Sequence, residues 1–156
     1  EAHAESTMPR YYFDLSAYKS YYEIGQPPYT PALSVVFALD VALAQILAEG
    51  MGSIFERHRD LGRMTREGVK KLGLKLFPDE SVASDTVTAV TVPDGVNAAG
   101  LLAALRTEHG VVLAGGQEGL SGKIFRIGHM GRCTVEEIQD VLDALELVLP
   151  QVGFTD

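Results

Sequence analysis

Residues 111–137 read VVLAGGQEGLSGKIFRIGHMGRCTVEE and hold most of the information about the fold. Two short apolar runs, Val111–Leu113 and Lys123–Ile127, flank a glycine-rich segment, which predicts two strands joined by a turn. Thr134 and Glu137 have the spacing of a capping box, so a helix is predicted to begin there. Strand, turn, strand and helix in succession are typical of an α+β domain.

The same alternation continues upstream. Thr86–Val92 is rich in β-branched residues and is predicted to be a strand, and Leu74–Phe77 is a shorter candidate. Asn97 can cap a helix that Gly110 closes. The order of these elements predicts a two-layer sandwich, in which helices cover one face of a small, mostly antiparallel sheet.

A long helix and an N-terminal arm precede this domain. Apolar residues at three- and four-residue spacing between residues 33 and 55 predict a buried stripe, with a kink at Gly50-Met51-Gly52. Thr30 before Pro31 is a typical helix start. Five of the six tyrosines lie before residue 25, so we expect this segment to pack on another surface. We therefore predict an arm over residues 1–30 and a small domain over residues 31–156.

Composition narrows the function classes. Hydrophobic residues make up 46% of the 156 residues and charged residues 22%, which allows a packed core. The formal net charge of −8 argues against a nucleic-acid partner, so the basic residues of the long helix are interpreted as a solvated face. No apolar run approaches a membrane span, and no signal peptide is visible. Cys133 is the only cysteine, which excludes an internal disulfide and favours a cytoplasmic location.

Arg126 is the leading candidate for a binding residue. Alternation along its strand places the side chain on the face opposite Phe125 and Ile127. A guanidinium on a short apolar strand needs an anion, and its planar fork fits a carboxylate through two parallel hydrogen bonds. The alternative is an ordinary intramolecular ion pair.

The other candidates each have two interpretations. The loop of residues 115–123 lacks the phosphate-loop pattern, because Gln117 and Ile124 stand where that pattern needs glycine and a hydroxyl residue. It is either a flexible turn with positive-φ residues or a loop that approaches a ligand. Thr30 is either a helix cap or a phosphate contact at a helix N-terminus. Tyr29 either packs its ring or donates a hydrogen bond. The histidines show no metal-ligand spacing, so no metal site is predicted.

Two segments resemble the class V aminotransferases, which depend on pyridoxal 5′-phosphate. Pro27-Pro28-Tyr29-Thr30-Pro31, followed by the long helix and Arg57-His58, is similar to the opening of that family's small domain. Residues 115–131 resemble its substrate-arginine segment. The similarity runs nearly end to end and is greatest to the serine/alanine–glyoxylate (serine–pyruvate) branch, some members of which are labelled soluble hydrogenase subunits.

The resemblance implies roles for three residues. Arg126 stands where the family places the arginine that binds the substrate α-carboxylate. Thr30 and Tyr29 stand where the family contacts the cofactor phosphate, in the neighbouring subunit of a homodimer. Relatives place a tyrosine three residues before this threonine, where this chain has Pro27. The implied substrates are small amino acids (serine, alanine) and 2-oxo acids (glyoxylate, pyruvate).

The resemblance also implies a missing N-terminal domain. In the family, that domain holds the Schiff-base lysine and the aspartate that pairs with the pyridinium nitrogen. None of the lysines here stands in that context: Lys19, Lys70, Lys71, Lys75 and Lys123. Without that lysine the cofactor chemistry cannot run, so we expect no catalytic residue in this chain and no activity from it alone. The alternative is a free-standing α+β module that binds a small anion or serves regulation or dimerisation.

Overall fold

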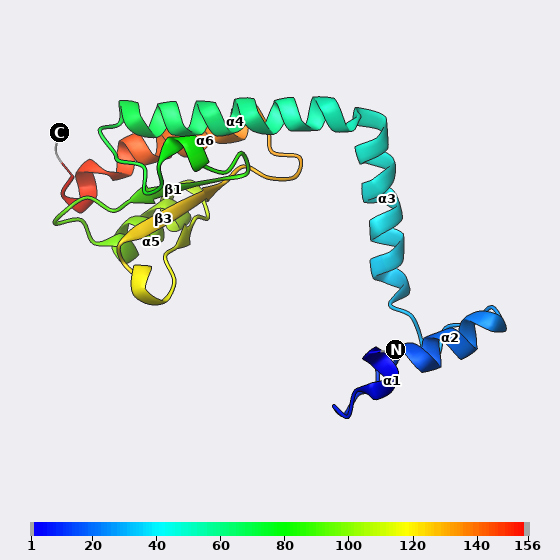
Figure 1. Cartoon of the computed structure of the whole chain (residues 1–156). Coiled ribbons are helices and arrows are strands. Elements are labelled where there is room, and N and C mark those ends of the chain that lie inside the picture. Colours follow the sequence, from blue (N-terminus) through cyan, green and yellow to red (C-terminus); the bar gives the residue numbers. More distant parts are fainter. Residues whose placement is uncertain (1, 155–156) are drawn as a thin grey trace. The chain divides into compact units, whose positions relative to one another are not determined.

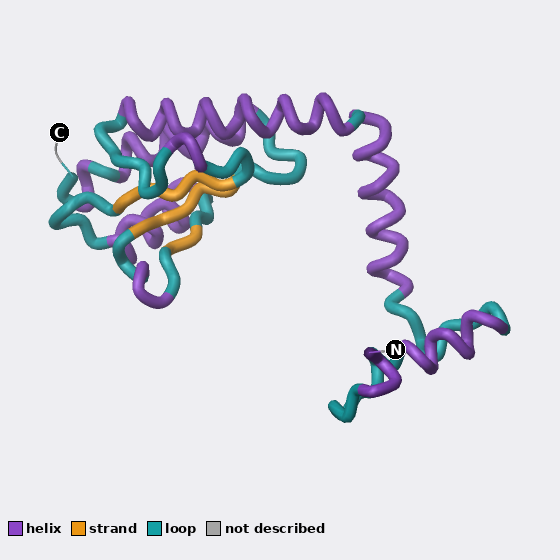
Figure 2. The backbone as a smooth tube through the Cα atoms, in the orientation of Figure 1, coloured by secondary structure: helices purple, strands orange, loops and turns teal. Residues whose placement is uncertain are grey.

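The computed structural model describes residues 2–154. Its elements fall into two compact units, Glu1–Ala48 and Glu49–Asp156. Figure 1 colours the chain from blue to red along the sequence, and Figure 2 shows the strands in orange, all of them in the second unit. The boundary at residue 30 that the sequence suggests between arm and domain remains a prediction.

The first unit is helical. It contains α1 (Ala2–Glu5), α2 (Leu15–Glu23) and nearly all of α3 (Leu33–Glu49). Asp14 caps α2, because its carboxylate accepts hydrogen bonds from the backbone N–H groups of Ser16 and Ala17. No residue of α2 or α3 is buried. The buried stripe predicted for the long helix is therefore wrong for α3, whose apolar side chains have no covering segment among residues 2–154.

Helix α3 also begins later than predicted. The first i→i−4 hydrogen bond runs from the Val36 N–H to the Ala32 carbonyl (3.1 Å), so Ala32 and not Thr30 occupies the N-cap position. The Leu33 N–H instead bonds the Pro31 carbonyl at 2.9 Å, in a tight turn that delays the helix. Thr30 is exposed and lies outside the helix.

The sequence predicts a kink in one long helix, but the structure has two helices: α3 ends at Glu49, and α4 (Met51–Lys71) begins after Gly50. Gly50 lies between them with φ of 84°, a backbone conformation that glycine adopts without strain. Within residues 2–154, no single helix is long and apolar enough to cross a membrane, and α3 and α4 meet that test only when they are counted together.

The second unit is the predicted α+β domain. After α4 come η1 (Glu80–Val82), β1 (Val87–Thr91), α5 (Ala98–His109), β2 (Ala114–Gly115), η2 (Glu118–Leu120), β3 (Ile124–Gly128), α6 (Val135–Val148) and η3 (Pro150–Val152). The sheet is antiparallel in the order β1-β3-β2, with β3 in the centre. Helices α4, α5 and α6 cover the face that carries Val90, Phe125 and Ile127 (Figure 1). The fold class and the one-sided helical layer are confirmed.

The helix ends in this unit follow their local signals. The Asn97 side chain accepts from the N–H groups at the start of α5, and Gly110 closes that helix in the left-handed conformation. Thr134 and Glu137 form the predicted capping box at α6.

Two predicted strands are wrong in extent. Leu74–Phe77 forms only an isolated bridge between Leu76 and Val90, before Pro78 ends it. Residues 111–113 are not a strand, and β2 is Ala114–Gly115 instead. The Val111 N–H bonds the Leu105 carbonyl at the end of α5, and Val111 and Leu113 pack against the core. This segment is therefore held by the helix and not by β3.

Candidate functional site

Arg126 lies in the middle of the central strand. Its partners in register are Ala89 on β1 and Ala114 on β2, both small residues on the face opposite Phe125 and Ile127. The side chain is half-buried. Its Nε and Nη2 atoms both donate to the Gly115 carbonyl oxygen, at 3.2 and 2.9 Å.

Arg126 has no acidic partner. Among residues 2–154, every ion pair involves a cation other than Arg126. No carboxylate oxygen of these residues lies within 4.0 Å of a nitrogen of the Arg126 guanidinium. The structure thus shows no intramolecular ion pair of Arg126 among residues 2–154. The guanidinium is held by a neutral carbonyl, so its positive charge is left available for an anion.

The glycine-rich loop beside Arg126 is a folded turn. Within it, Gly122 (φ 73°) and Glu118 (φ 47°) have positive φ. Gly116 is required for a different reason: a Cβ there would collide with the Leu120 carbonyl. The Gly116 N–H bonds the Ile124 carbonyl at 2.9 Å, which joins the turn to β3.

An open hollow of about 550 Å³ adjoins Arg126. Its wall consists mainly of the apolar segment 111–114 together with Ile127 and Met130, and α6 adds Glu137 and Asp140. A volume of this size is in the usual range of small-molecule sites. The hollow therefore places apolar surface next to a cation that has no acidic partner.

Tyr29 and Thr30 belong to the first unit, and Arg126 belongs to the second. The ring of Tyr29 packs against Tyr11 and Tyr12 at centroid distances of 4.9 and 4.8 Å, and its hydroxyl donates to the Tyr11 carbonyl at 2.7 Å. Tyr29 is thus a packed ring whose hydroxyl donates within the chain. Loss of hydration raises the pKa of Tyr29, since the ionised phenolate would be poorly solvated there. Thr30, by contrast, is exposed.

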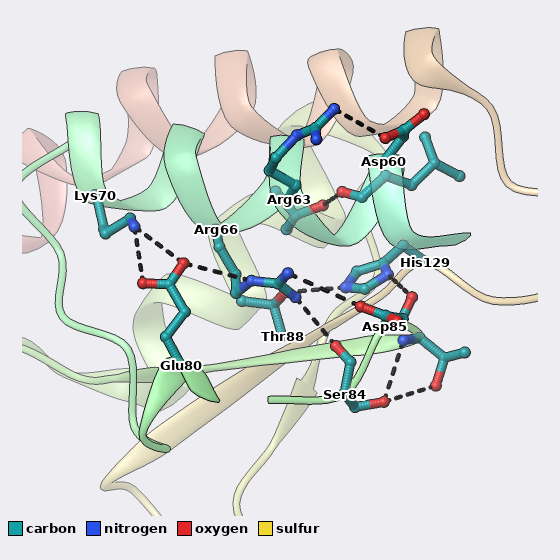
Figure 3. A network of polar contacts seen from close by, with 12 residues as sticks. Asp60, Arg63, Arg66, Lys70, Glu80, Ser84, Asp85, Thr88 and His129 are labelled. Atoms are coloured by element: carbon teal, nitrogen blue, oxygen red, sulfur yellow. Dashed lines mark hydrogen bonds and ion pairs between the residues drawn. The ribbon is translucent and has the colours of Figure 1, made fainter. Parts of the chain in front are cut away.

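His129 is a buried residue that the sequence does not reveal as important. It is 0% exposed, its Nδ1 donates to the Asp85 carbonyl at 3.1 Å, and its Nε2 accepts from the Thr88 hydroxyl at 2.9 Å (Figure 3). Burial lowers the pKa of His129, so the ring is neutral. The alternation that places Phe125 and Ile127 inside would have placed residue 129 inside as well.

Several basic residues of α4 are exposed, as a solvated face requires, but Arg57 and Arg66 are partly buried in ion pairs. Arg66 lies between Glu80 and Asp85 with only 11% of its side chain exposed, and Lys70 pairs with Glu80 at 3.0 Å (Figure 3). Arg57 binds both carboxylate oxygens of Glu49, and its Nη1 donates to the Gly131 carbonyl at 2.8 Å. Arg57 thus fixes the turn that follows β3.

The donor groups fit only part of a pyridoxal 5′-phosphate site. All five lysines are exposed, whereas a lysine that forms an imine is activated by desolvation or a neighbouring cation. Residues 2–154 also contain no group of three His, Cys, Asp or Glu side chains that could hold a metal ion. What the described residues offer is an arginine without an acidic partner and an exposed threonine hydroxyl.

Comparison with known proteins gives the family. The chain is 43% identical over 145 residues to an uncharacterized aminotransferase of Methanocaldococcus jannaschii, a match that covers 92% of this chain and 38% of that protein. It is 40% identical to the small subunit of a soluble hydrogenase of Synechococcus, over 100% of this chain and 40% of the relative. A serine–glyoxylate aminotransferase of Arabidopsis thaliana is 34% identical over 99% of the chain and 39% of its own length.

The fold gives the same result. The crystal structure of ureidoglycine–glyoxylate aminotransferase from Bacillus subtilis superposes with a TM-score of 0.91 at 34% identity, over 98% of this chain and 40% of that one. This chain belongs to the class V aminotransferases. It corresponds to their C-terminal small domain and spans about 40% of the length of the relatives it matches. The resemblance is confirmed, including the soluble hydrogenase label among relatives, although no protein-family profile matches the chain.

Proposed function

We propose that this chain is the substrate-carboxylate domain of a pyridoxal 5′-phosphate-dependent enzyme. That enzyme transfers amino groups between small amino acids, such as serine and alanine, and 2-oxo acids, such as glyoxylate and pyruvate. The supporting observation is Arg126, whose guanidinium is fixed by a backbone carbonyl and has no acidic partner among residues 2–154. Relatives named for glyoxylate support the substrate class.

Arg126 acts by orientation and charge. Every amino acid and 2-oxo acid has a carboxylate next to the reacting carbon, so one arginine can align both substrates. Charge-assisted hydrogen bonds from a partly desolvated guanidinium are about twice as strong as neutral ones. When bound, the cofactor supplies the electron sink for the amino transfer. Arg126 then holds the reacting carbon at a fixed distance from it.

Thr30 and Tyr29 complete the proposal at the cofactor phosphate. Thr30 is exposed and its hydroxyl is not used as a helix cap, which leaves it available to a phosphate. Tyr29, the residue before Thr30, packs its ring on Tyr11 and Tyr12 and so supports the backbone at Thr30. In this proposal both residues serve the neighbouring subunit of a homodimer.

The remaining partner is an N-terminal domain that holds the cofactor lysine. The matched relatives are much longer than this chain, and the apolar side chains of α3 need a surface to cover them. A free-standing anion-binding module is less favoured for both reasons. The free thiol of Cys133 supports a reducing, cytoplasmic setting.

The proposal is tested by comparing the full-length polypeptide with this chain alone. With pyridoxal 5′-phosphate and alanine or serine, the full-length polypeptide should convert glyoxylate into glycine, and borohydride should attach one pyridoxyl group to a lysine outside this chain. The chain alone should do neither. Stoichiometric labelling of one of its five lysines, or a full-length polypeptide with no transfer activity, would overturn the proposal.

A further inference from the structure

The hydrogen bonds of Arg126 use one particular edge of its guanidinium. Nε and Nη2 both donate to a single acceptor, the Gly115 carbonyl oxygen. A guanidinium has five N–H groups in a plane, and these form two bidentate edges: one from Nε with one terminal nitrogen, the other from both terminal nitrogens. The Gly115 carbonyl occupies the first edge, so the Nη1–Nη2 edge is left for a ligand.

The Arg126 side chain can reach the Gly115 carbonyl because β2 consists of two small residues, Ala114 and Gly115. Ala114 is the register partner of Arg126 and lies on the same face, so the arginine reaches across a methyl group to the next carbonyl. Gly115 lies opposite Phe125 and faces the helical layer, where a Cβ would approach Leu102. The Gly116 N–H anchors the strand end to Ile124. A larger residue at position 114 would occupy the path of the Arg126 side chain.

We propose that the Gly115 carbonyl, reached across Ala114, is the positioning group that presents the Nη1–Nη2 edge of Arg126 to the substrate carboxylate. The carboxylate then binds end-on, through both terminal nitrogens, and the Nε edge stays on the protein. This inference rests on the proposed function and adds to it the geometry of binding and a residue, Ala114, that controls it.

The physical advantage is preorganisation. A long arginine side chain loses much rotational freedom when it is fixed. A guanidinium held by the backbone loses this entropy when the protein folds, so the substrate carboxylate binds without that loss. Because the acceptor is a neutral carbonyl, it orients the cation without neutralising it. A carboxylate in the place of the Gly115 carbonyl would orient the cation but also neutralise it, and it would compete with the substrate carboxylate.

Kinetics of the full-length holoenzyme give the first test. Ala114→Leu places a larger side chain next to the Arg126 side chain. Because Ala114 is exposed on an edge strand, we expect the fold to tolerate this change. Ala103→Leu, on the exposed face of α5, is the matched control. We expect KM for both alanine and glyoxylate to rise roughly tenfold in Ala114→Leu, the loss of about one charge-assisted hydrogen bond. Cofactor retention and Tm should match Ala103→Leu. Unchanged KM values in Ala114→Leu would refute the positioning role.

Nitrogen NMR of the same holoenzyme, labelled with ¹⁵N-arginine, gives the second test. The probe is acetate, an unreactive carboxylate, and the Arg126 signals are assigned by their loss in Arg126→Lys. End-on binding shifts the terminal nitrogens of Arg126 and leaves Nε unmoved. A shift of Nε as large as that of the terminal nitrogens would refute the inference while carboxylate binding stands. If acetate moves none of these signals and the wild-type enzyme transfers no amino group, the proposed function itself has failed.

Discussion

Glu118, in the turn next to Arg126, has φ of 47° and is the only non-glycine residue with positive φ among residues 2–154. A left-handed conformation costs an L-residue roughly 1–2 kcal/mol, and glycine avoids most of that cost. We predict that Glu118→Gly raises the free energy of unfolding by about 0.5–1 kcal/mol, after its larger entropy loss on folding is subtracted. Urea denaturation measures this change. Glu118→Ala keeps the strain and should gain nothing, and a destabilised glycine variant would contradict the prediction.

His129 makes the stability depend on pH. Burial lowers its pKa below 6.5, the value in the unfolded chain. Below pH 6.5 the unfolded chain therefore binds a proton that the folded chain does not, so the free energy of unfolding falls as the pH decreases from 6.5. We predict that His129→Gln removes this slope between pH 6.5 and 5. The carboxylates with lowered pKa, such as Glu49 and Asp79, lose their contribution only at lower pH. An unchanged slope in the variant would show that another group titrates.

Sequence reasoning identified Arg126 but not the group that holds it. The candidate followed from strand alternation and from the chemistry of a guanidinium on an apolar strand. The Gly115 carbonyl could not be predicted, because it depends on the register of β2 against β3. Strand alternation indicates that residue 129 lies inside, but the hydrogen bonds of His129 could not be predicted, because its partners Asp85 and Thr88 are more than forty residues away in the sequence.

Among the elements, α4 and α6 approach each other closely at Gly68. A Cβ at this position would collide with the terminal carbons of Leu142 on α6. We predict that Gly68→Ala lowers the free energy of unfolding by about 1–3 kcal/mol through overpacking, although alanine has the higher helix propensity. Thermal or urea denaturation measures the loss.

A double-mutant cycle gives the control. Leu142→Ala alone should be destabilising, because it removes a core side chain. Combined with Gly68→Ala it should cost clearly less than the sum of the two changes, since the new methyl group then has room. Strict additivity would mean that the two helices do not meet at this point.

The capped helices and the two long strands β1 and β3 were predicted well, and the two short segments next to the sheet were not. Helices α5 and α6 have caps and closing residues within their own sequence, so their starts were correct. The segment 74–77 pairs with β1 only through a single bridge, and the Val111 N–H at the start of segment 111–113 bonds the end of α5. The apolar residues of α3 have the predicted spacing, but none of them is buried in the structure of residues 2–154.

At the scale of the molecule, the first unit exposes much apolar surface. Phe37 and Leu47 on α3 are 67% and 78% exposed, and Phe13 in the segment before α2 is 86% exposed. We predict that residues 11–22 exchange their amide hydrogens rapidly in a monomer of this chain, because segments with few buried contacts open at little cost. The same residues should be protected in the full-length dimer. Hydrogen-exchange mass spectrometry tests both states, and strong protection in a proven monomer would contradict the account.

The most direct test of the central claim is the ratio of kcat/KM for alanine in the full-length enzyme with and without Arg126→Lys. Lysine keeps the charge but loses the planar fork, so we predict a fall of roughly ten- to a hundredfold with cofactor binding intact. Thr30→Ala is the complementary variant: it should weaken cofactor retention, and it should not cost stability because Ala32 occupies the cap position. If Arg126→Lys leaves kcat/KM unchanged and instead unfolds the domain, Arg126 is structural and the claim is wrong.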